Sequence, residues 1–300
     1  RRVNFREDFE EVGLLGSGTF ADVYKVRQKQ GGAPGAFYAV KKSKRQFRSK
    51  RDREWLMAEV RTMKLLGQQS ACAYVVPFIR AWQEDSYFYV QMGYAERGTL
   101  RELLIHLVSP PKRSGTIANS THCSNNITGC LPVMADNTVW HVVHDVCAGL
   151  QHIHSCGMVH LDIKPANLLI TESGTLQIGD FGMAAAIGSC DDGNEGDTRY
   201  MAEELLNNTE RLPSADMFSL GLTLFEICCF YATHGLPSNG SLWHNLREDN
   251  APPLPKQRDS TLQQLVAACM KRDPTVRPTA VQVLGMPKVA ETLDDVDPVL

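Results

Sequence analysis

The stretch of the sequence most specific for chemistry is His160-Leu161-Asp162-Ile163-Lys164-Pro165-Ala166-Asn167. Within it, Asp162 can accept a proton from a substrate hydroxyl, Lys164 can neutralise a transferring phosphoryl group and Asn167 can ligate a metal ion. Asp180-Phe181-Gly182 follows shortly afterwards, and its carboxylate can bind Mg²⁺ that bridges nucleotide phosphates. Either motif alone can arise by chance, so the interpretation depends on what precedes them.

A glycine-rich turn, Gly16-Ser17-Gly18, precedes them between two expected strands. A dinucleotide-binding fold would need a helix after this turn, whereas the alternation over residues 22–27 predicts a strand. Because glycine has no Cβ, backbone N–H groups in such a turn can approach the oxygens of a triphosphate. By itself the turn also fits an ordinary glycine hairpin.

A lysine on the next strand completes the set. Lys41, in Ala39-Val40-Lys41, can hold the α- and β-phosphates of a nucleotide if Glu59 on the following helix orients its ammonium group. Considered separately, both charges also fit an exposed surface, and Lys42 is an adjacent competitor. Five elements in this order and spacing form the protein-kinase motif set, which predicts transfer of a phosphoryl group from ATP with Mg²⁺ held by Asn167 and Asp180.

The kinase motif set also implies an adenine site. Met92 is expected at the back of this site, and the backbone of Gly93, Tyr94 and Ala95 is expected to supply hydrogen bonds. The side chains and turn residues expected to line the rest of the nucleotide site are Leu15, Gly16, Ser17, Gly18, Val23 and Ala39.

The elements that must position these residues divide the chain in two. Residues 9–92 read mostly as strands around one helix at 52–66, and the pattern after Gly98 is helical, with an apolar helix at 215–230. We therefore expect an α+β bilobal kinase domain over residues 9–288, with an N-lobe at 1–92, a join at 93–97 and a C-lobe at 98–288. A polar, aperiodic stretch at 108–137 predicts a disordered insertion, and residues 289–300 form a C-terminal tail.

One ion pair and one buried carboxylate are expected to support the C-lobe. Glu204 lies in Met201-Ala202-Glu203-Glu204, where kinases have Ala-Pro-Glu, and Arg277 is its expected partner. Asp216, at the head of the apolar helix, is placed to hold the backbone of residues 160–167.

The composition of the 300 residues limits the class of protein further. A formal net charge of -3 gives no basic field for nucleic acid, and no run approaches the roughly 18 apolar residues of a membrane span. Nine irregularly spaced cysteines indicate reduced thiols in an intracellular protein. Because the chain begins at Arg1 without Met, we expect a fragment, and a membrane tether in flanking sequence remains compatible with it.

The details of the sequence resemble the Wee/Myt kinases, which inhibit cyclin-dependent kinases. Glu195-Gly196-Asp197-Thr198-Arg199-Tyr200 is similar to the family's activation-segment signature. Further matches are His160–Asn167, Tyr38–Ser43, Ala81-Trp82-Gln83-Glu84-Asp85, Ala215–Gly221 and Trp243-His244-Asn245-Leu246-Arg247. The resemblance covers residues 9–285 apart from the insertion.

This resemblance implies phosphorylation of tyrosine, with threonine as a further acceptor, in the glycine-rich loop of a cyclin-bound cyclin-dependent kinase, which restrains mitotic entry. It implies a monomer that acts on a protein substrate, in the nucleus in preference to the cytoplasm. We expect no contact of this stretch with nucleic acid or with a membrane. Lys164 alone would favour an ordinary Ser/Thr kinase, and a pseudokinase scaffold is the other alternative, although the motif residues are intact.

Three positions depart from the usual kinase pattern. Leu161 replaces the arginine before Asp162, so no cation there can pair with a phosphorylated activation segment. We hypothesise that activity does not require phosphorylation of that segment; loss of activity on dephosphorylation, restored by phosphorylation, would contradict this. Ala21 replaces the third glycine of the loop, and Glu203 replaces the proline of Ala-Pro-Glu.

Overall fold

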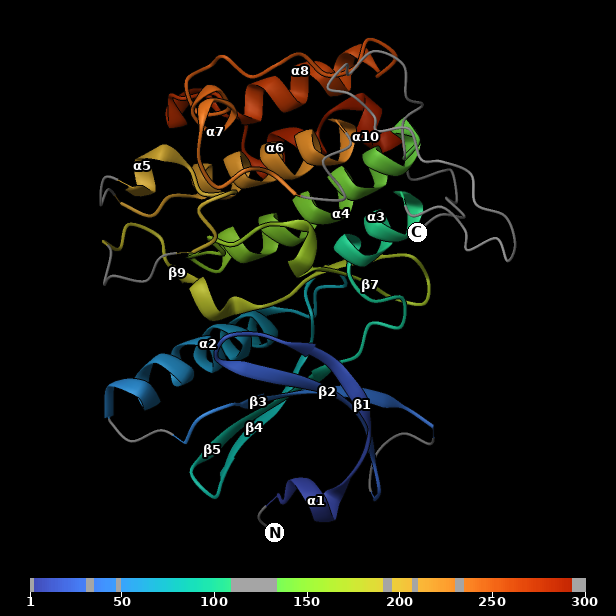
Figure 1. Cartoon of the computed structure of the whole chain (residues 1–300), viewed down its shortest axis with the longest axis vertical. Helices are drawn as coiled ribbons and strands as arrows, with labels where there is room; N and C mark the ends of the chain where they lie inside the picture. Colours follow the sequence, from blue (N-terminus) through green and yellow to red (C-terminus); the bar gives the residue numbers. More distant parts are fainter. Residues whose placement is uncertain are drawn as a thin grey trace, which may run out of the picture.

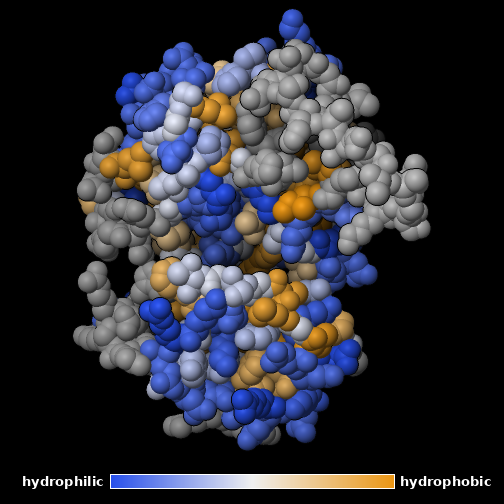
Figure 2. Space-filling model, in the orientation of Figure 1, coloured by the Kyte–Doolittle hydropathy of each residue, from blue (hydrophilic) through white to orange (hydrophobic). Residues whose placement is uncertain are grey.

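The computed structural model describes residues 3–30, 35–46, 50–108, 134–190, 196–206, 210–229 and 235–292. These residues form a strand-rich lobe from the first third of the chain and a helical lobe from the rest, as Figure 1 shows. This is the bilobal α+β architecture that the sequence predicts. Figure 2 shows a recess that crosses this face of the molecule between the two lobes.

The N-lobe is built on a five-stranded antiparallel sheet in the order β1-β2-β3-β5-β4. Its strands are β1 (Phe9–Ser17), β2 (Ala21–Gln28), β3 (Phe37–Ser43), β4 (Phe78–Glu84) and β5 (Tyr87–Gly93). The register pairs Val23 with Lys41, and Ala39 with Met92. Because side chains alternate between the faces of a sheet, these residues share one face.

Both faces of this sheet are covered. Helix α2 (Lys50–Gln69) packs Val60, Met63 and Leu66 against the face that carries Ala39 and Val90, within the main core. The other face carries a second, separate cluster of buried side chains under the short helix α1 (Phe5–Asp8), which the sequence did not predict. The members of this cluster are Phe5, Phe9, Val26, Val40 and Tyr89.

The C-lobe is organised around α6 (Pro213–Cys229), whose residues 215–228 are all buried. An apolar helix without a polar face fits only a central position, which confirms the sequence expectation. The other helices are α3 (Leu100–Val108), α4 (Asp136–Ser155), α5 (Glu203–Leu206), α7 (Ser241–Asn245), α8 (Ser260–Cys269), α9 (Ala280–Leu284) and α10 (Pro287–Thr292). Two small antiparallel pairs face the N-lobe: β6 (Met158–Val159) with β9 (Ala185–Ala186), and β7 (Leu168–Ile170) with β8 (Leu176–Ile178).

One sequence expectation needs correction at its bounds. The disordered insertion was expected at 108–137, but Val108 ends α3 and α4 already begins at Asp136. The Asp136 carboxylate accepts from Arg258 Nη1 and from the backbone N–H of Asp259, both at 2.6 Å, and these contacts fix the start of the helix. Residues 109–133 of that prediction lie outside the described residues.

Strand β4 begins at Phe78, directly after Pro77. Pro77 has no N–H to give to a sheet ladder, so the strand starts after it. Elsewhere, the described cysteines are all free, in keeping with reduced thiols. Among the described residues, no helix combines the length and apolar character that a membrane span needs.

Candidate active site

A chain of charges joins the two lobes at the recess. The Lys41 ammonium on β3 lies 2.8 Å from Glu59 Oε1 on α2 and 2.9 Å from Asp180 Oδ1 of the C-lobe. Burial lowers the pKa of Lys41, but the two carboxylates outweigh it and raise the pKa above its ordinary value. Lys41 is therefore fully charged, and the structure brings together three residues that the sequence singled out separately.

Asp180 is held by the segments on either side of it. Its own backbone has φ +59°, in the left-handed region, and Phe181 beside it is buried with its ring 5.1 Å from the His160 ring. The preceding Gly179 donates its N–H to the Asn167 carbonyl at 2.9 Å and accepts a hydrogen bond from His160 Nε2 at 3.0 Å. These contacts place the Asp180 carboxylate next to residues 160–167.

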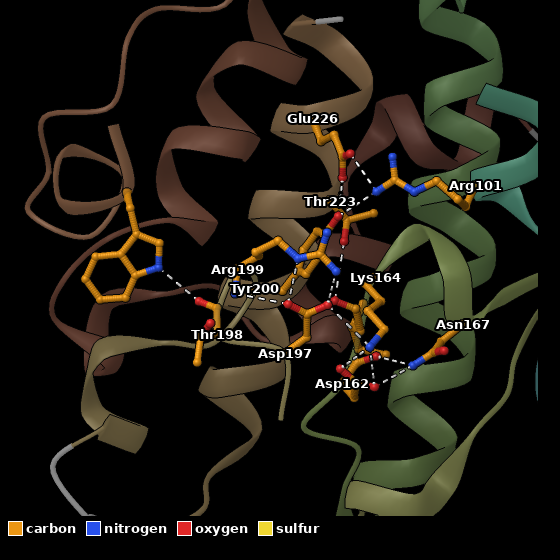
Figure 3. Close-up of polar contacts among 12 residues, drawn as sticks. Arg101, Asp162, Lys164, Asn167, Asp197, Thr198, Arg199, Tyr200, Thr223 and Glu226 are labelled. Atoms are coloured by element: carbon orange, nitrogen blue, oxygen red, sulfur yellow. Dashed lines mark hydrogen bonds and ion pairs between the residues drawn. The ribbon is translucent and has the colours of Figure 1, made fainter. Parts of the chain in front are cut away.

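Asp162 is oriented by its own loop, as Figure 3 shows. Asn167 Nδ2 donates to Asp162 Oδ2 at 2.8 Å and to the Asp162 carbonyl at 2.8 Å. Lys164 Nζ donates to Asp162 Oδ1 at 2.9 Å. A carboxylate with both oxygens bound in this way has little rotational freedom, as a proton acceptor for a substrate hydroxyl requires.

The backbone of this loop is fixed from below by Asp216, which is fully buried at the head of α6. Its carboxylate accepts the N–H groups of His160 at 2.9 Å and Leu161 at 2.7 Å, and it pairs with His154 at 2.8 Å. Leu161 has φ +66°, a backbone conformation that costs a residue other than glycine about 1–3 kcal/mol. The surrounding contacts must offset this cost. The expected role of Asp216 is confirmed by this geometry.

The predicted nucleotide-lining side chains share the sheet face that carries Lys41. Val23, Ala39 and Met92 lie on the adjacent strands β2, β3 and β5, and Leu15 is 41% exposed on β1. The glycine turn is closed by a hydrogen bond from Gly18 N–H to the Ala21 carbonyl at 2.9 Å. An added Cβ at Gly16 would meet no protein atom within 4 Å, so the space beside this glycine is open.

The join between the lobes contains a glycine for a steric reason. A Cβ at Gly93 would lie 2.7 Å from Pro77 Cγ, and the Gly93 N–H donates to the Pro77 carbonyl at 3.0 Å. Gly93 therefore cannot offer its N–H to a ligand. The expectation that residues 93–95 bind adenine narrows to the remaining backbone groups, chiefly the Gly93 carbonyl and the Ala95 N–H.

The donor set of the recess is compatible with Mg²⁺. Asp180 supplies a carboxylate, and Asn167 has its Nδ2 committed to Asp162, so its amide oxygen is the atom suited to a cation. Oxygen ligands of this kind are what Mg²⁺ prefers, and Asp180 and Asn167 would hold it. The backbone bond between Gly179 and Asn167 keeps the two neighbours together.

Several contacts beside Asp162 were not predicted from the sequence. Asp197 accepts two hydrogen bonds from the Arg199 guanidinium, at 2.8 and 2.6 Å, and lies 3.6 Å from Lys164 Nζ. Burial favours protonation of Asp197, but the two cations outweigh it and hold its pKa below the usual range. The family signature at 195–200 marked these residues but gave them no structural role.

A buried network lies behind this pair, as Figure 3 shows. Glu226 of α6, fully buried, accepts from the Tyr200 hydroxyl at 2.5 Å and lies 2.6 Å from Arg101 Nη2 of α3. The same Arg101 nitrogen lies 2.7 Å from the Tyr200 hydroxyl. Burial raises the pKa of Glu226, against the opposing effect of Tyr200 and Arg101. A glutamate inside an apolar helix was the one available sequence signal.

The end of the segment is secured as predicted. Arg277 is bound bidentately by the Glu204 carboxylate, at 2.5 and 3.0 Å, and donates to the Ser214 carbonyl. Glu203, in the place of the usual proline, pairs instead with Arg272 at 2.9 Å on the surface. The departure at Glu203 thus leaves the Glu204–Arg277 pair intact.

Comparison with known proteins identifies the family of the chain. A family model for the protein kinase domain matches residues 9–288, and the chain therefore belongs to the protein kinase family. It is 36% identical over 288 residues to a probable protein kinase of Dictyostelium discoideum, a match that covers 95% of this chain and 74% of that protein.

The resemblance to the Wee/Myt kinases is also confirmed. The chain is 34% identical to the membrane-associated tyrosine- and threonine-specific cdc2-inhibitory kinase of Drosophila melanogaster, over 95% of this chain and 48% of that protein. It is 32% identical to the mitosis inhibitor protein kinase wee1 of Schizosaccharomyces pombe, over 94% of this chain and 31% of that protein. The chain thus spans half or less of the length of these two relatives.

Proposed function

We propose that this chain is an active Wee/Myt-type kinase that transfers phosphate from ATP to tyrosine, with threonine as a further acceptor, in the glycine-rich loop of a cyclin-dependent kinase. Modification of that loop would inhibit the target and restrain mitotic entry. The observation that carries the proposal is the contact of Lys41 with both Glu59 and Asp180, which is the arrangement that phosphoryl transfer requires. The names of the Drosophila and fission-yeast relatives support the target.

The residues divide the transfer among themselves. ATP bound with Mg²⁺ supplies the phosphoryl group. Lys41 neutralises charge on the α- and β-phosphates, and Asn167 and Asp180 hold the metal ion. Asp162 takes the proton of the attacking hydroxyl, while Lys164, 2.9 Å from Asp162, is close enough to stabilise charge on the transferring group.

The surroundings of the reaction are part of the same proposal. The partner is a folded, cyclin-bound kinase that presents a loop, so this chain needs no surface for nucleic acid or lipid, and it acts as a monomer. We place the protein inside the cell, in the nucleus in preference to the cytoplasm. Its own net charge of -3 is in keeping with a protein substrate rather than a polyanion.

The test incubates the domain with ATP, Mg²⁺ and a cyclin-bound cyclin-dependent kinase, and the products are mapped by mass spectrometry. We expect phosphotyrosine in the target's glycine-rich loop. Asp162→Asn should lower the rate by about 10²–10⁴-fold, because the general base is lost; its single amide oxygen can keep only one of the two hydrogen bonds that the carboxylate accepts from Lys164 and Asn167. Equal thermal stability of the variant and the wild type is the control for folding.

The outcomes separate the alternatives. Phosphate on Ser and Thr alone would show an ordinary Ser/Thr kinase and contradict the proposal. Binding of ATP without turnover would show a pseudokinase scaffold. An Asp162→Asn variant as active as the wild type would remove Asp162 from its role.

A further inference from the structure

Four consecutive backbone carbonyls of the activation segment, those of residues 198–201, all accept hydrogen bonds from side chains of the C-lobe. Ser219 Oγ donates to the Tyr200 carbonyl at 2.8 Å, and Trp243 Nε1 donates to the Thr198 carbonyl at 3.0 Å. Arg247 reaches three of the four: Thr198 at 2.8 Å, Arg199 at 3.2 Å and Met201 at 2.8 Å. We call Ser219, Trp243 and Arg247 the carbonyl anchor.

Arg247 is the centre of this anchor, and it is unusual for its burial. It follows α7, is 1% exposed, and adds a second bond to the Met201 carbonyl through Nε at 3.1 Å. Its guanidinium lies 3.9 Å from the centre of the Trp243 ring, a cation–π contact. Burial lowers the pKa of Arg247 to about 10, so it remains a cation at neutral pH.

The orientation of the segment explains why such an anchor is needed. Asp197 and Arg199 lie on the Asp162 side, where Asp197 is 3.6 Å from Lys164 Nζ. If a carbonyl of residues 198–201 lost its hydrogen bond, the peptide planes could rotate and carry Asp197 away from Lys164. The anchor therefore fixes, through the backbone, side chains that face the place of the substrate.

Few side chains of the activation segment could carry a phosphate that would hold the segment in the same way. Between Asp180 and Glu204 the hydroxyl side chains are those of Ser189, Thr198 and Tyr200; Ser189 Oγ donates to the Ala186 carbonyl at 2.7 Å, and the Tyr200 hydroxyl is buried against Glu226. Leu161, where a phosphate-binding arginine would stand, is itself buried in the core. The segment is thus held by a resident cation that binds carbonyl dipoles.

We propose that Arg247, supported by Trp243, is a positioning residue that holds residues 198–201 in the shape that receives the protein substrate, in place of a phosphorylated side chain. The part of this inference that concerns substrate rests on the proposed kinase function. The part that concerns the segment does not, because it follows from the contacts of Arg247 alone.

The first experiment measures hydrogen exchange of peptides covering residues 196–206. Arg247→Met should raise their exchange rate about tenfold or more, since the Arg199 and Met201 carbonyls lose their side-chain donor and the Thr198 carbonyl keeps only Trp243. Arg247→Lys keeps the charge but not the fork of donors and should give an intermediate effect. Trp243→Phe keeps the ring under the guanidinium and removes one N–H, so it serves as a mild variant if Arg247→Met does not fold. Unchanged exchange in Arg247→Lys and Trp243→Phe would overturn the inference.

The second experiment compares Michaelis constants after phosphatase treatment, with the cyclin-bound kinase as substrate. Arg247→Lys should raise KM for the protein substrate about tenfold and leave KM for ATP within about twofold, since Arg247 does not contact the nucleotide face. An equal change in both constants, or no change in either, would overturn the positioning role. If the wild type phosphorylates nothing, the proposed function fails, and hydrogen exchange still decides whether Arg247 holds the segment.

Arg258→Met is the matched control. Arg258 is also a buried arginine, 3% exposed, and donates to the Met134 carbonyl at 2.7 Å and to Asp136 at 2.6 Å, contacts that lie outside the activation segment. We expect it to lower thermal stability without a selective rise in exchange at 196–206. The same selective rise in Arg258→Met would show general destabilisation and contradict the inference.

Discussion

The two sides of the active site are held together by different kinds of force. On the nucleotide side, Lys41 forms ion pairs with Glu59 of its own lobe and with Asp180 of the C-lobe. On the substrate side, the activation segment is held within one lobe by backbone carbonyls bound to Arg247 and Trp243. Asp162 lies between the two sides.

The difference shows which parts can move independently. The contact between the lobes on the nucleotide side depends on the ion pair Lys41–Asp180, so it can be lost without disturbing the backbone of either lobe. Hydrogen bonds to consecutive carbonyls instead make the segment part of the C-lobe core. We therefore expect mutations on the nucleotide side to change catalysis most, and mutations on the substrate side to change mainly stability.

The largest effect should come from Lys41→Met, which breaks the nucleotide side. Loss of the ammonium group should lower kcat/KM by about 10²–10³-fold, because electrostatic stabilisation of the phosphates disappears. It also leaves the buried Glu59 without its counter-charge, so thermal stability should fall as well. Steady-state kinetics and thermal unfolding measure the two effects. Lys42→Met is the control: Lys42 lies on the opposite face of the sheet, 5.0 Å from the Tyr87 ring, and should leave the rate within about twofold. A kcat/KM of Lys41→Met within about twofold of the wild type would contradict the role of Lys41.

A smaller effect, of the opposite kind, is expected from Glu226→Gln on the substrate side. The variant removes the buried negative charge that lies 2.6 Å from Arg101 Nη2 and should lower the free energy of unfolding by about 2 kcal/mol. Affinity for ATP should not change. Denaturant unfolding and nucleotide titration measure both quantities, and Glu10→Gln, which breaks an exposed pair with Arg27, should cost less than about 0.5 kcal/mol. Weakened ATP binding in Glu226→Gln would show that the two sides are coupled.

The smallest effect concerns pH and distinguishes the sides by sign. The pKa of Asp197 is lowered in the folded state, so its contribution to stability is present above the unfolded pKa of about 3.9 and is lost as pH falls through the lower, folded value. The pKa of Lys41 is raised, so its contribution is present at neutral pH and is lost only at alkaline pH. Urea unfolding of wild type and Asp197→Asn at successive pH values should show a gap that closes below about pH 4. A gap that instead opens on acidification would reverse the assignment.

The same contrast explains how much the sequence could predict. The two lobes and the helices at 52–66 and 215–230 were predicted from residue periodicity, and Lys41, Glu59, Asp162, Asn167 and Asp180 were predicted from motifs whose spacing reflects one shared reaction. The geometry groups these residues, and the roles assigned to them remain proposals. Asp216 and the Glu204–Arg277 pair were predicted for the same reason, and their contacts are present.

The contacts of the substrate side were out of reach of sequence reasoning. Arg247 donates to backbone carbonyls. Because every residue has a carbonyl, no pattern of side chains in the sequence predicts which carbonyls will accept. Glu226 is a polar residue in an apolar helix, and the sequence does not predict that Tyr200 and Arg101 are its partners. Helix α1 was missed because it is four residues long and depends on a cap from Asn4 rather than on periodicity.

Helix α1 has a practical consequence for work with this protein. The protein kinase family match starts at residue 9, yet Phe5 stacks on Tyr89 at 5.3 Å, and its N–H donates to Glu84 at 2.7 Å. A shortened chain that starts at the family boundary would uncover the aromatic rings on the outer face of the sheet. Such a surface promotes aggregation, so recombinant versions should retain residues 3–8 to remain well behaved in solution.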